Sequence, residues 1–329
     1  MEGSTASYEY DDDADASHDL FHPDFATTDD ATRADTKEEC DEQVDTSISE
    51  TKYNPNKPKW WKNLSRAPTK GQKKAMNDVL TDHRLPRIPY GTFLDWNEIY
   101  PDYKEIWLEI GFGRGENLLA LAHRKPRDCL LVGAEIAGTG IGVACGRIRD
   151  GLKENKFWKD YELYSAEKNP FVEASVAQPD DSAPEGDEAS DDDATKIYDN
   201  VRIFPGDGAK LLPYIPSGTL DALLITFPDP FAKNAEEEWR LIQLNTLEEM
   251  HRVLKPSTGR LYLATDHDGF HAWSHSVIER YNQKKSSFLL VEPVPSRLEW
   301  VPVVSRYEKK GWEEGRSTKL SCWRVVCSD

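Results

Sequence analysis

Short apolar runs and amphipathic segments alternate along the chain from residue 105 onward. The run EIWLEI (105–110) predicts a buried strand, and it is followed by a glycine turn and the helical pattern ENLLALAHR. The run CLLVGAEI (129–136) predicts a second strand, with a helix after it that extends to about residue 154. Further strands are predicted at 201–204, 220–227, 259–265 and 319–326, and an amphipathic helix at 236–254. This alternation favours an α/β fold with a mostly parallel sheet flanked by helices.

Charge is distributed unevenly along the 329 residues. The net charge is −18, but residues 1–50 contribute −15 and residues 173–199 contribute −9, so the remainder is net basic. Both acidic segments have too little apolar surface to offset chain entropy, and a solvated loop is the favoured interpretation of the second, with partner binding as the alternative. We expect an acidic disordered tail (1–55), a basic RNA-binding extension (56–104) and a main domain (105–329) with an acidic disordered insert at about 170–199.

The segment 51–76 contains eight Lys or Arg residues and no acid, with Tyr53, Trp60 and Trp61 among them. Interleaved cations and aromatic rings suit phosphate contact and base stacking. A basic linker whose tryptophans dock on the main domain would have the same composition. The sequence leaves both interpretations open.

Several other classes of protein are disfavoured. The five cysteines form no CxxC pair and no zinc spacing, so we expect no metal site and a reducing compartment. Cys129 lies in an apolar run and is expected in the core. No apolar run has the length of a membrane span, and the acidic N-terminus is unlike a targeting peptide. We therefore expect a soluble intracellular protein without membrane contact, in the nucleus or cytoplasm, with an organelle as the open alternative.

The first predicted strand leads into the glycine-rich turn EIGFGRGEN. Glu109 precedes Gly111, Gly113 and Gly115, and glycines let a backbone turn tightly and approach a ligand. The spacing differs from the G-x-G-x-x-G of dinucleotide sites, and Glu109 would repel a pyrophosphate, which disfavours a dehydrogenase. An acid here suits a cationic ligand, such as the amino acid end of S-adenosylmethionine. A purely structural glycine turn is the alternative.

Acidic residues also stand at the ends of the next three strands. Glu135, followed by Ile136, ends the second strand, where a carboxylate can accept hydrogen bonds from ribose hydroxyls. Asp207 and Gly208 follow the third strand, where Asp207 can accept from an adenine amino group, and Asp229 follows the fourth. Each acid alone could cap a helix. The carboxyl ends of parallel strands meet at one edge, however, so we expect a cofactor site there.

Together these segments resemble a known family, the tRNA (guanine-N7)-methyltransferases of the bacterial TrmB type and their eukaryotic relatives. The matching motifs, in order, are LEIGFGRGE, GAEI, FPDPFAK, VLKPSTGRLYLATD and SRYEKKG, and RAPTKGQKKAM resembles the family's basic N-terminal segment. The resemblance covers roughly residues 64–326 apart from the acidic insert. It implies a Rossmann-like class I methyltransferase fold with S-adenosyl-L-methionine as cofactor. The implied activity is methylation of guanine N7, of the position-46 type in the variable loop, in tRNA.

The resemblance also implies roles for individual residues. Cofactor-binding positions are Glu109, Gly111, Gly113, Glu135, Ile136, Asp207, Gly208 and Asp229, of which Asp229 is also the expected catalytic residue. Substrate contacts are implied for Lys233, Asp266, Ser305, Arg306, Tyr307 and Glu308, with Asp266 and Glu308 near the guanine N1 and N2 donors. The implied partners are tRNA and, as in eukaryotic relatives, a WD-repeat subunit.

The chain departs from the family pattern after its Pro-Asp-Pro motif. The family usually continues with His and a run of Lys or Arg, whereas this chain has Glu236, Glu237 and Glu238, and Phe231 stands where Trp or His is common. An acidic turn would repel a phosphate backbone, so the alternative is a non-catalytic, cofactor-binding relative that acts in a protein assembly. A third interpretation is a small-molecule methyltransferase, for which the basic segment 51–76 would be superfluous.

The chemistry implied for Asp229 requires orientation rather than proton abstraction. Guanine N7 carries an in-plane lone pair and no proton, so methyl transfer to it depends mainly on positioning and electrostatics. Pro228 and Pro230 flank Asp229 and restrict the backbone on both sides. A fixed carboxylate in such a turn suits this chemistry, and a plain turn with a capping Asp is the alternative.

Overall fold

The computed structural model describes residues 66–89, 91–171, 197–285 and 287–326, which all lie in one compact unit. The expected acidic tail, the three aromatic residues of the basic segment before residue 66 and most of the acidic insert lie outside the described residues.

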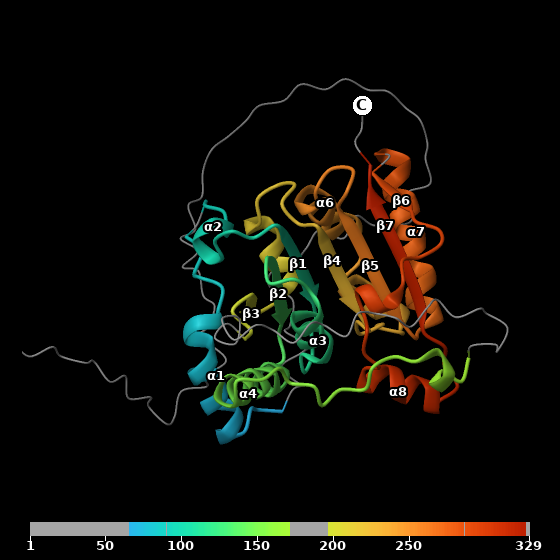
Figure 1. Cartoon of the computed structure of the whole chain (residues 1–329). Coiled ribbons are helices and arrows are strands. Elements are labelled where there is room, and N and C mark those ends of the chain that lie inside the picture. Colours follow the sequence, from blue (N-terminus) through green and yellow to red (C-terminus); the bar gives the residue numbers. More distant parts are fainter. Residues whose placement is uncertain (1–65, 90, 172–196, 286, 327–329) are drawn as a thin grey trace, which may run out of the picture. The chain divides into compact units, whose positions relative to one another are not determined.

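A seven-stranded sheet with the order β3-β2-β1-β4-β5-β7-β6 forms the centre of this unit (Figure 1). The strands are β1 (Glu105–Ile110), β2 (Cys129–Glu135), β3 (Val201–Pro205), β4 (Ala222–Thr226), β5 (Arg260–Thr265), β6 (Phe288–Leu290) and β7 (Lys319–Val325). Strands β1 to β5 are parallel, and β7 runs antiparallel to its neighbours β5 and β6. This sheet confirms the predicted α/β fold with a mostly parallel sheet flanked by helices.

Helices cover both faces of the sheet, which explains why the central strands are almost continuously apolar. They are α1 (Lys70–His83), α2 (Trp96–Ile99), α3 (Glu116–Arg124), α4 (Gly138–Glu154), α5 (Gly208–Leu211), α6 (Leu244–Val253), α7 (Asp268–Lys284) and α8 (Arg306–Glu313). One core packs α5, α6 and α7 against the face that carries Ile106 and Leu108. The other packs α1, α3 and α4 against the opposite face and includes Trp107, Trp300 and, as expected, Cys129.

The described part of the basic segment is a helix docked on the main domain. Helix α1 begins with a capping box at Thr69 and Gln72 and buries Ala75 and Val79 against α4. Gln72 approaches Gly142 so closely that a Cβ there would lie 2.6 Å from its side chain. Lys70, Lys73 and Lys74 of α1 remain exposed. The helix therefore docks on the body with one face and presents cations on the other, so both interpretations of the segment stay open.

The helix predicted at 236–254 is wrong in its first half. Residues Asn234–Trp239 form a 3-10 helix, and the α-helix begins only at Leu244. Between them the chain bends at Arg240, whose side chain turns inward, and Gln243 caps α6 and donates to the Glu237 carbonyl at 2.6 Å. The apolar spacing by itself predicts one continuous helix, but the contacts of Arg240 and Gln243 interrupt the helix between Trp239 and Leu244.

The C-terminal boundary predicted for the acidic insert is also wrong. Ile197 is 6% exposed and Tyr198 is fully buried, where its hydroxyl accepts a hydrogen bond from the Trp158 backbone. The body of the domain therefore resumes by residue 197 rather than after 199. None of the helices in the described ranges combines the length and the apolar character that a membrane span requires.

Candidate functional site

The glycine turn after β1 lies against the end of β2. Gly111, Gly113 and Gly115 all have positive φ values, of 81°, 58° and 79°, which L-residues with side chains rarely adopt. A Cβ built on Gly111 or Gly113 would meet no atom within 4 Å, so this part of the turn borders open space. The Gly113 amide donates to Glu135 Oε2 at 2.7 Å and thereby joins the turn to β2.

Glu135 is buried at the end of β2 and is held by backbone amides. Besides the Gly113 amide, those of Ile136 and Ala137 donate to its Oε1 at 2.8 and 2.7 Å. Burial raises the pKa of Glu135, and these hydrogen bonds act in the opposite direction. Since a carboxylate has about four acceptor positions, three bonds leave room for one further donor. The geometry therefore favours one ribose hydroxyl at Glu135 rather than two.

Glu109 is a buried acid with one unused oxygen. Its Oε1 accepts hydrogen bonds from Thr226 Oγ1 at 2.7 Å and Asn117 Nδ2 at 3.2 Å, while Oε2 is buried without a partner among the described residues. Burial raises the pKa of Glu109 to about 7. An unsatisfied buried oxygen costs free energy unless a donor reaches it. A cationic ligand donor beside the glycine turn would supply that partner.

Asp207 acts as a helix cap at the third strand. Its Oδ1 accepts from the Ala209 amide at 3.0 Å and so caps the short helix α5, which was the alternative interpretation of this acid. Burial raises its pKa. Gly208 follows, and a Cβ there would lie 2.6 Å from Ile110 of β1. The cap places Asp207 at the same edge as Glu109 and Glu135.

Asp229 is exposed in a strained turn after β4. Its Oδ1 accepts from the Phe231 amide at 3.2 Å, and Phe227 and Phe231 have φ values of 47° and 42°. A non-glycine residue in this region costs of order 1–3 kcal/mol and persists only when surrounding contacts hold it. Such strain is concentrated at functional sites, so it supports a functional role for the turn that carries Asp229.

The acidic run after this turn is paired within the turn itself. Glu236 lies 3.7 Å from Lys233 Nζ, and Glu237 lies 3.2 Å from Arg240 Nη1. The Lys233 side chain is 82% exposed, so its ion pair is a weak surface contact that solvent screens. Two of the three glutamates therefore have a cationic partner beside them, and Lys233 stays accessible to a phosphate.

The expected SRYE segment forms the start of α8. Ser305 caps the helix, its Oγ accepting from the Glu308 amide at 3.1 Å. Arg306 and Tyr307 are exposed, and the Arg306 guanidinium lies 5.3 Å from the centre of the Tyr307 ring. These side chains can contact a large ligand, because a cation and an aromatic ring stand together in solvent.

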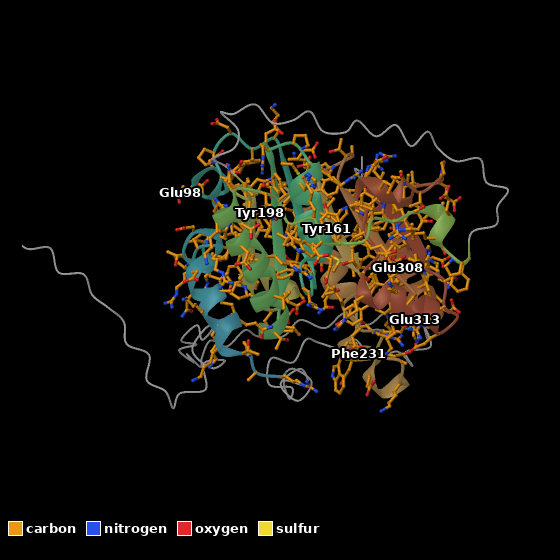
Figure 2. The ribbon with its side chains drawn as sticks, turned by 60° about the horizontal axis from the view of Figure 1, so that its bottom comes forward. Glu98, Tyr161, Tyr198, Phe231, Glu308 and Glu313 are labelled. Atoms are coloured by element: carbon orange, nitrogen blue, oxygen red, sulfur yellow. The ribbon has the colours of Figure 1, made fainter. Side chains whose placement is uncertain are left out.

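Glu308 does not fit the expectation of a direct substrate contact. It is fully buried, with Oε1 and Oε2 at 2.7 and 3.0 Å from the two terminal nitrogens of Arg297, and Thr318 Oγ1 donates to Oε1 at 2.6 Å. Glu308 is labelled in Figure 2. Arg297 also lies over the Tyr164 ring at 3.9 Å. With both carboxylate oxygens engaged and no solvent exposure, Glu308 fixes α8 in place rather than presenting a carboxylate to a base.

Asp266, after β5, is held by a distant arginine. Its Oδ2 lies 2.9 Å from Arg316 Nε, and a Cβ on Gly311 of α8 would come within 2.4 Å of the same oxygen. The carboxylate is therefore wedged against α8. It remains partly exposed, so a substrate donor can still approach this carboxylate.

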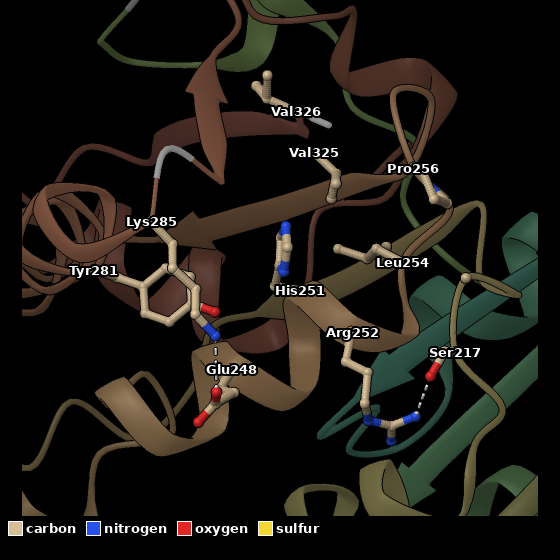
Figure 3. A pocket seen from close by; sticks show the side chains of 11 residues that line it. Ser217, Glu248, His251, Arg252, Leu254, Pro256, Tyr281, Lys285, Val325 and Val326 are labelled. Atoms are coloured by element: carbon tan, nitrogen blue, oxygen red, sulfur yellow. Dashed lines mark hydrogen bonds and ion pairs between the residues drawn. The ribbon is translucent and has the colours of Figure 1, made fainter. Parts of the chain in front are cut away.

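A large surface cavity lies away from these residues. Its volume is about 600 Å³, and it is bordered by Gly218, Leu254 and Pro256, which precede β4 and β5, and by Val325 at the end of β7 (Figure 3). Its lining contains none of the residues predicted for the site. It therefore opens at the amino edge of the parallel strands, opposite the edge that carries the acids.

Sequence reasoning missed four residues that shape the site. They are Asn117 and Thr226, which hold Glu109, and the arginines Arg240 and Arg297. Asn117 lies in the first turn of α3, two residues after Gly115, and Thr226 ends β4, so their positions at the strand edge were a usable signal. The arginines contact carbonyls and carboxylates that no local pattern indicates.

Comparisons with known proteins show what the chain is similar to. The Methyltransf_4 family model, described as "Putative methyltransferase", matches residues 183–320. A tRNA (guanine-N(7)-)-methyltransferase of Caulobacter sp. (strain K31) is 29% identical over 249 residues, covering 75% of this chain and 86% of the relative. The protein of the same name from Rhodospirillum rubrum is 28% identical and covers 76% and 83%. Among solved structures, the 16S rRNA methyltransferase KamB shares 10% identity with a TM-score of 0.43, covering 75% of this chain and 99% of that one.

Proposed function

Since the chain is similar to tRNA (guanine-N(7)-)-methyltransferases over about three quarters of its length, we propose that it transfers a methyl group from S-adenosylmethionine to N7 of a guanine in tRNA. The guanine is of the position-46 type, in the variable loop. The observation that carries the proposal is the gathering of Glu109, Glu135, Asp207 and Asp229 at the carboxyl edge of four adjacent parallel strands.

The described residues fit the cofactor. Open space beside Gly111 and Gly113 admits a ligand close to the backbone, and the unpartnered Oε2 of Glu109 suits an ammonium donor. The remaining acceptor position of Glu135 suits a ribose hydroxyl, and the Asp207 carboxylate suits an adenine amino group. When bound, S-adenosylmethionine supplies an electrophilic methyl group on a positively charged sulfur.

The chain contributes orientation and charge to the reaction. Asp229 accepts hydrogen bonds from the guanine edge and keeps a negative charge near the ring, which becomes positive as N7 is methylated. No general base is needed, because N7 carries no proton. The exposed Lys233 and the lysines of α1 contact phosphates, and Tyr307 with Arg306 contacts an unstacked base or its neighbours.

The non-catalytic alternative rested on the acidic run after the Pro-Asp-Pro motif. Glu237 pairs with the buried Arg240, which reduces its repulsion of a phosphate backbone, whereas Glu236 has only a weak surface contact with Lys233. The run therefore gives little reason to prefer a binding role over catalysis. A WD-repeat subunit, as in eukaryotic relatives, is the protein partner that we propose to test with the enzyme.

The experiment is methyl transfer from labelled S-adenosylmethionine to an unmodified tRNA transcript, with and without a WD-repeat partner. Nuclease digestion and mass spectrometry then identify the modified nucleoside. We expect 7-methylguanosine, and none when the variable-loop guanine is replaced by adenine. Label on another atom or another nucleotide, or no label under both conditions, would overturn the proposal.

A further inference from the structure

Arg240 is a buried cation that contacts the turn carrying Asp229. Its Nε donates to the Pro230 carbonyl at 3.0 Å and its Nη2 donates to the Phe231 carbonyl at 3.1 Å. Only 6% of the residue is exposed. Two consecutive carbonyls directly after Asp229 are thus fixed by one rigid, planar group, which a flexible point charge such as lysine cannot reproduce.

Other contacts fix the guanidinium itself. Nη1 lies 3.2 Å from Glu237 Oε1, and the guanidinium carbon lies 4.8 Å from the centre of the Trp273 ring on α7. The Trp273 indole in turn donates to the Ile242 carbonyl at 2.9 Å. Helix α7 packs on the sheet, so these contacts connect the turn to the rigid core.

The strain of the turn explains why it needs such an anchor. Phe227 and Phe231 both have positive φ values, and both flank Asp229 at a distance of two residues. Their cost, of order 1–3 kcal/mol each, would be relieved if the turn could relax. Relaxation would move the Asp229 carboxylate, and misplacement of a reacting group by about 1 Å can lower a rate by about 100-fold.

We propose that Arg240 is a positioning residue for the reaction, which acts by holding the Pro-Asp-Pro turn so that Asp229 faces the substrate guanine. It does not touch the substrate. This inference rests on the proposed function, because it assigns to Arg240 a role that is exercised through Asp229.

The test compares Arg240→Lys and Arg240→Met with Arg252→Lys in single-turnover methyl transfer at saturating cofactor. Arg252 is a matched control: it donates to the Ile215 and Leu212 carbonyls at 2.8 Å each and pairs with Glu249, but it lies at the opposite edge of the sheet. We expect both Arg240 variants to lose about 10- to 100-fold in rate, with unchanged cofactor affinity. The Arg252 variant should retain the rate of the native chain.

A double-mutant cycle separates positioning from general destabilisation. In an Asp229→Asn background, Arg240→Lys should cost less than threefold, because the group that it positions has already lost its charge. Additive losses, or a loss in the Arg252 control equal to that at Arg240, would overturn the inference. If Arg240→Met does not fold, the milder Lys variant decides the question. If Asp229→Asn alone leaves the rate unchanged, the proposed mechanism fails instead.

Discussion

The two halves of the carboxyl edge hold their functional side chains by different means. On the β1–β3 side, Glu109, Glu135 and Asp207 are largely buried and accept hydrogen bonds from amides or side chains of neighbouring turns and strands. On the β4–β5 side, the turn of Asp229, the carboxylate of Asp266 and helix α8 are each held by an arginine. We call these the amide-held half and the arginine-held half.

The difference matches the proposed function. In that proposal the amide-held half surrounds the small cofactor, and its groups come from adjacent turns that the sheet already places together. The arginine-held half would face tRNA, and its exposed turn and helix have less core packing to define them. A guanidinium with five donors can fix several acceptors at once, and this supplies the rigidity that packing does not.

The largest effect is expected from the buried ion pair of the arginine-held half. Arg297→Met removes the cation that pairs with Glu308. The fully buried Glu308 carboxylate would then keep only the hydrogen bond from the Thr318 hydroxyl, without water to solvate its charge. Breaking such a pair costs about 3–5 kcal/mol. We expect a loss of this size in the free energy of urea unfolding of the whole chain.

The control for this prediction is Arg316→Met. Arg316 pairs with Asp266 in a partly exposed site, so its loss should cost up to about 1 kcal/mol. Equal losses for the two variants would contradict the assignment of Glu308 as a buried structural group and would make it available again as a substrate contact.

Asp229→Asn is expected to have the next largest effect, and on rate rather than stability. The substitution keeps the shape of the turn but removes the charge, so methyl transfer should fall by about 10²–10³-fold. Affinity for tRNA should change little, since phosphate contacts lie elsewhere. Single-turnover assays at saturating cofactor measure the first quantity and filter binding measures the second.

Asp221→Asn is the matched control for Asp229. Asp221 lies at the opposite end of β4, where it accepts from the Ile106 amide and pairs with Lys255. Its amide variant should lose some stability and keep the rate of methyl transfer. A rate near that of the native chain for Asp229→Asn would mean that the Pro-Asp-Pro motif is only a turn.

Glu109 gives the amide-held half a dependence on pH. Burial raises its pKa to about 7 from an ordinary value of 4.5. Between these values the folded chain keeps a proton that the unfolded chain has released, so the free energy of unfolding should fall as pH rises from about 4.5 to about 7, and Glu109 should contribute no further slope above that. Urea unfolding at several pH values, compared between the native chain and Glu109→Gln, isolates this contribution.

The Thr226 hydroxyl should determine the pH at which this fall in the free energy of unfolding ends. Its hydrogen bond favours the ionised form of Glu109, so Thr226→Val should raise the pKa further and extend the falling stability above pH 7. An identical pH profile for Glu109→Gln and the native chain would show that Glu109 titrates as an ordinary acid.

The two halves also differ in how far the sequence predicts them. Glu109, Glu135 and Asp207 each stand at the end of an apolar run followed by a glycine or a turn, so strand prediction alone places them at one edge. The amides that hold Glu135 and Asp207 lie within a few residues or on an adjacent strand, whereas Glu109 is held by Asn117 and by the distant Thr226. Local pattern and parallel-sheet topology therefore suffice to place the three acids, although not to predict every group that holds them.

The arginine-held half depends on contacts between distant parts of the chain. Asp266 and Arg316 are 50 residues apart, and Arg240 reaches back ten residues to Pro230. The same contact bends the chain at Arg240 and explains why the continuous helix predicted at 236–254 was wrong. The end of the acidic insert was predicted too late for a related reason. The acidic residues before Tyr198 gave no sign that this residue is buried in the core.

The smallest effect is expected at the cap of α8. It tests whether the arginine-held half also depends on a hydrogen bond within its own helix. Ser305 Oγ accepts from the Glu308 amide, and loss of such a cap costs about 1 kcal/mol, so Ser305→Ala should lower stability by that amount and Ser305→Thr should restore it. Asp95 is the matched control, because it caps α2 with hydrogen bonds of 2.9 and 3.3 Å to the Asn97 and Glu98 amides, in a helix that carries none of the predicted site residues. Asp95→Ala should lose similar stability and keep the rate.

Ser305→Ala should in addition raise the KM for tRNA several-fold, since its hydroxyl proton is free to reach the substrate while the oxygen caps the helix. Equal KM values for the two alanine variants, measured with matched folded fractions, would reduce Ser305 to a cap and leave Arg306 and Tyr307 as the contacts of α8.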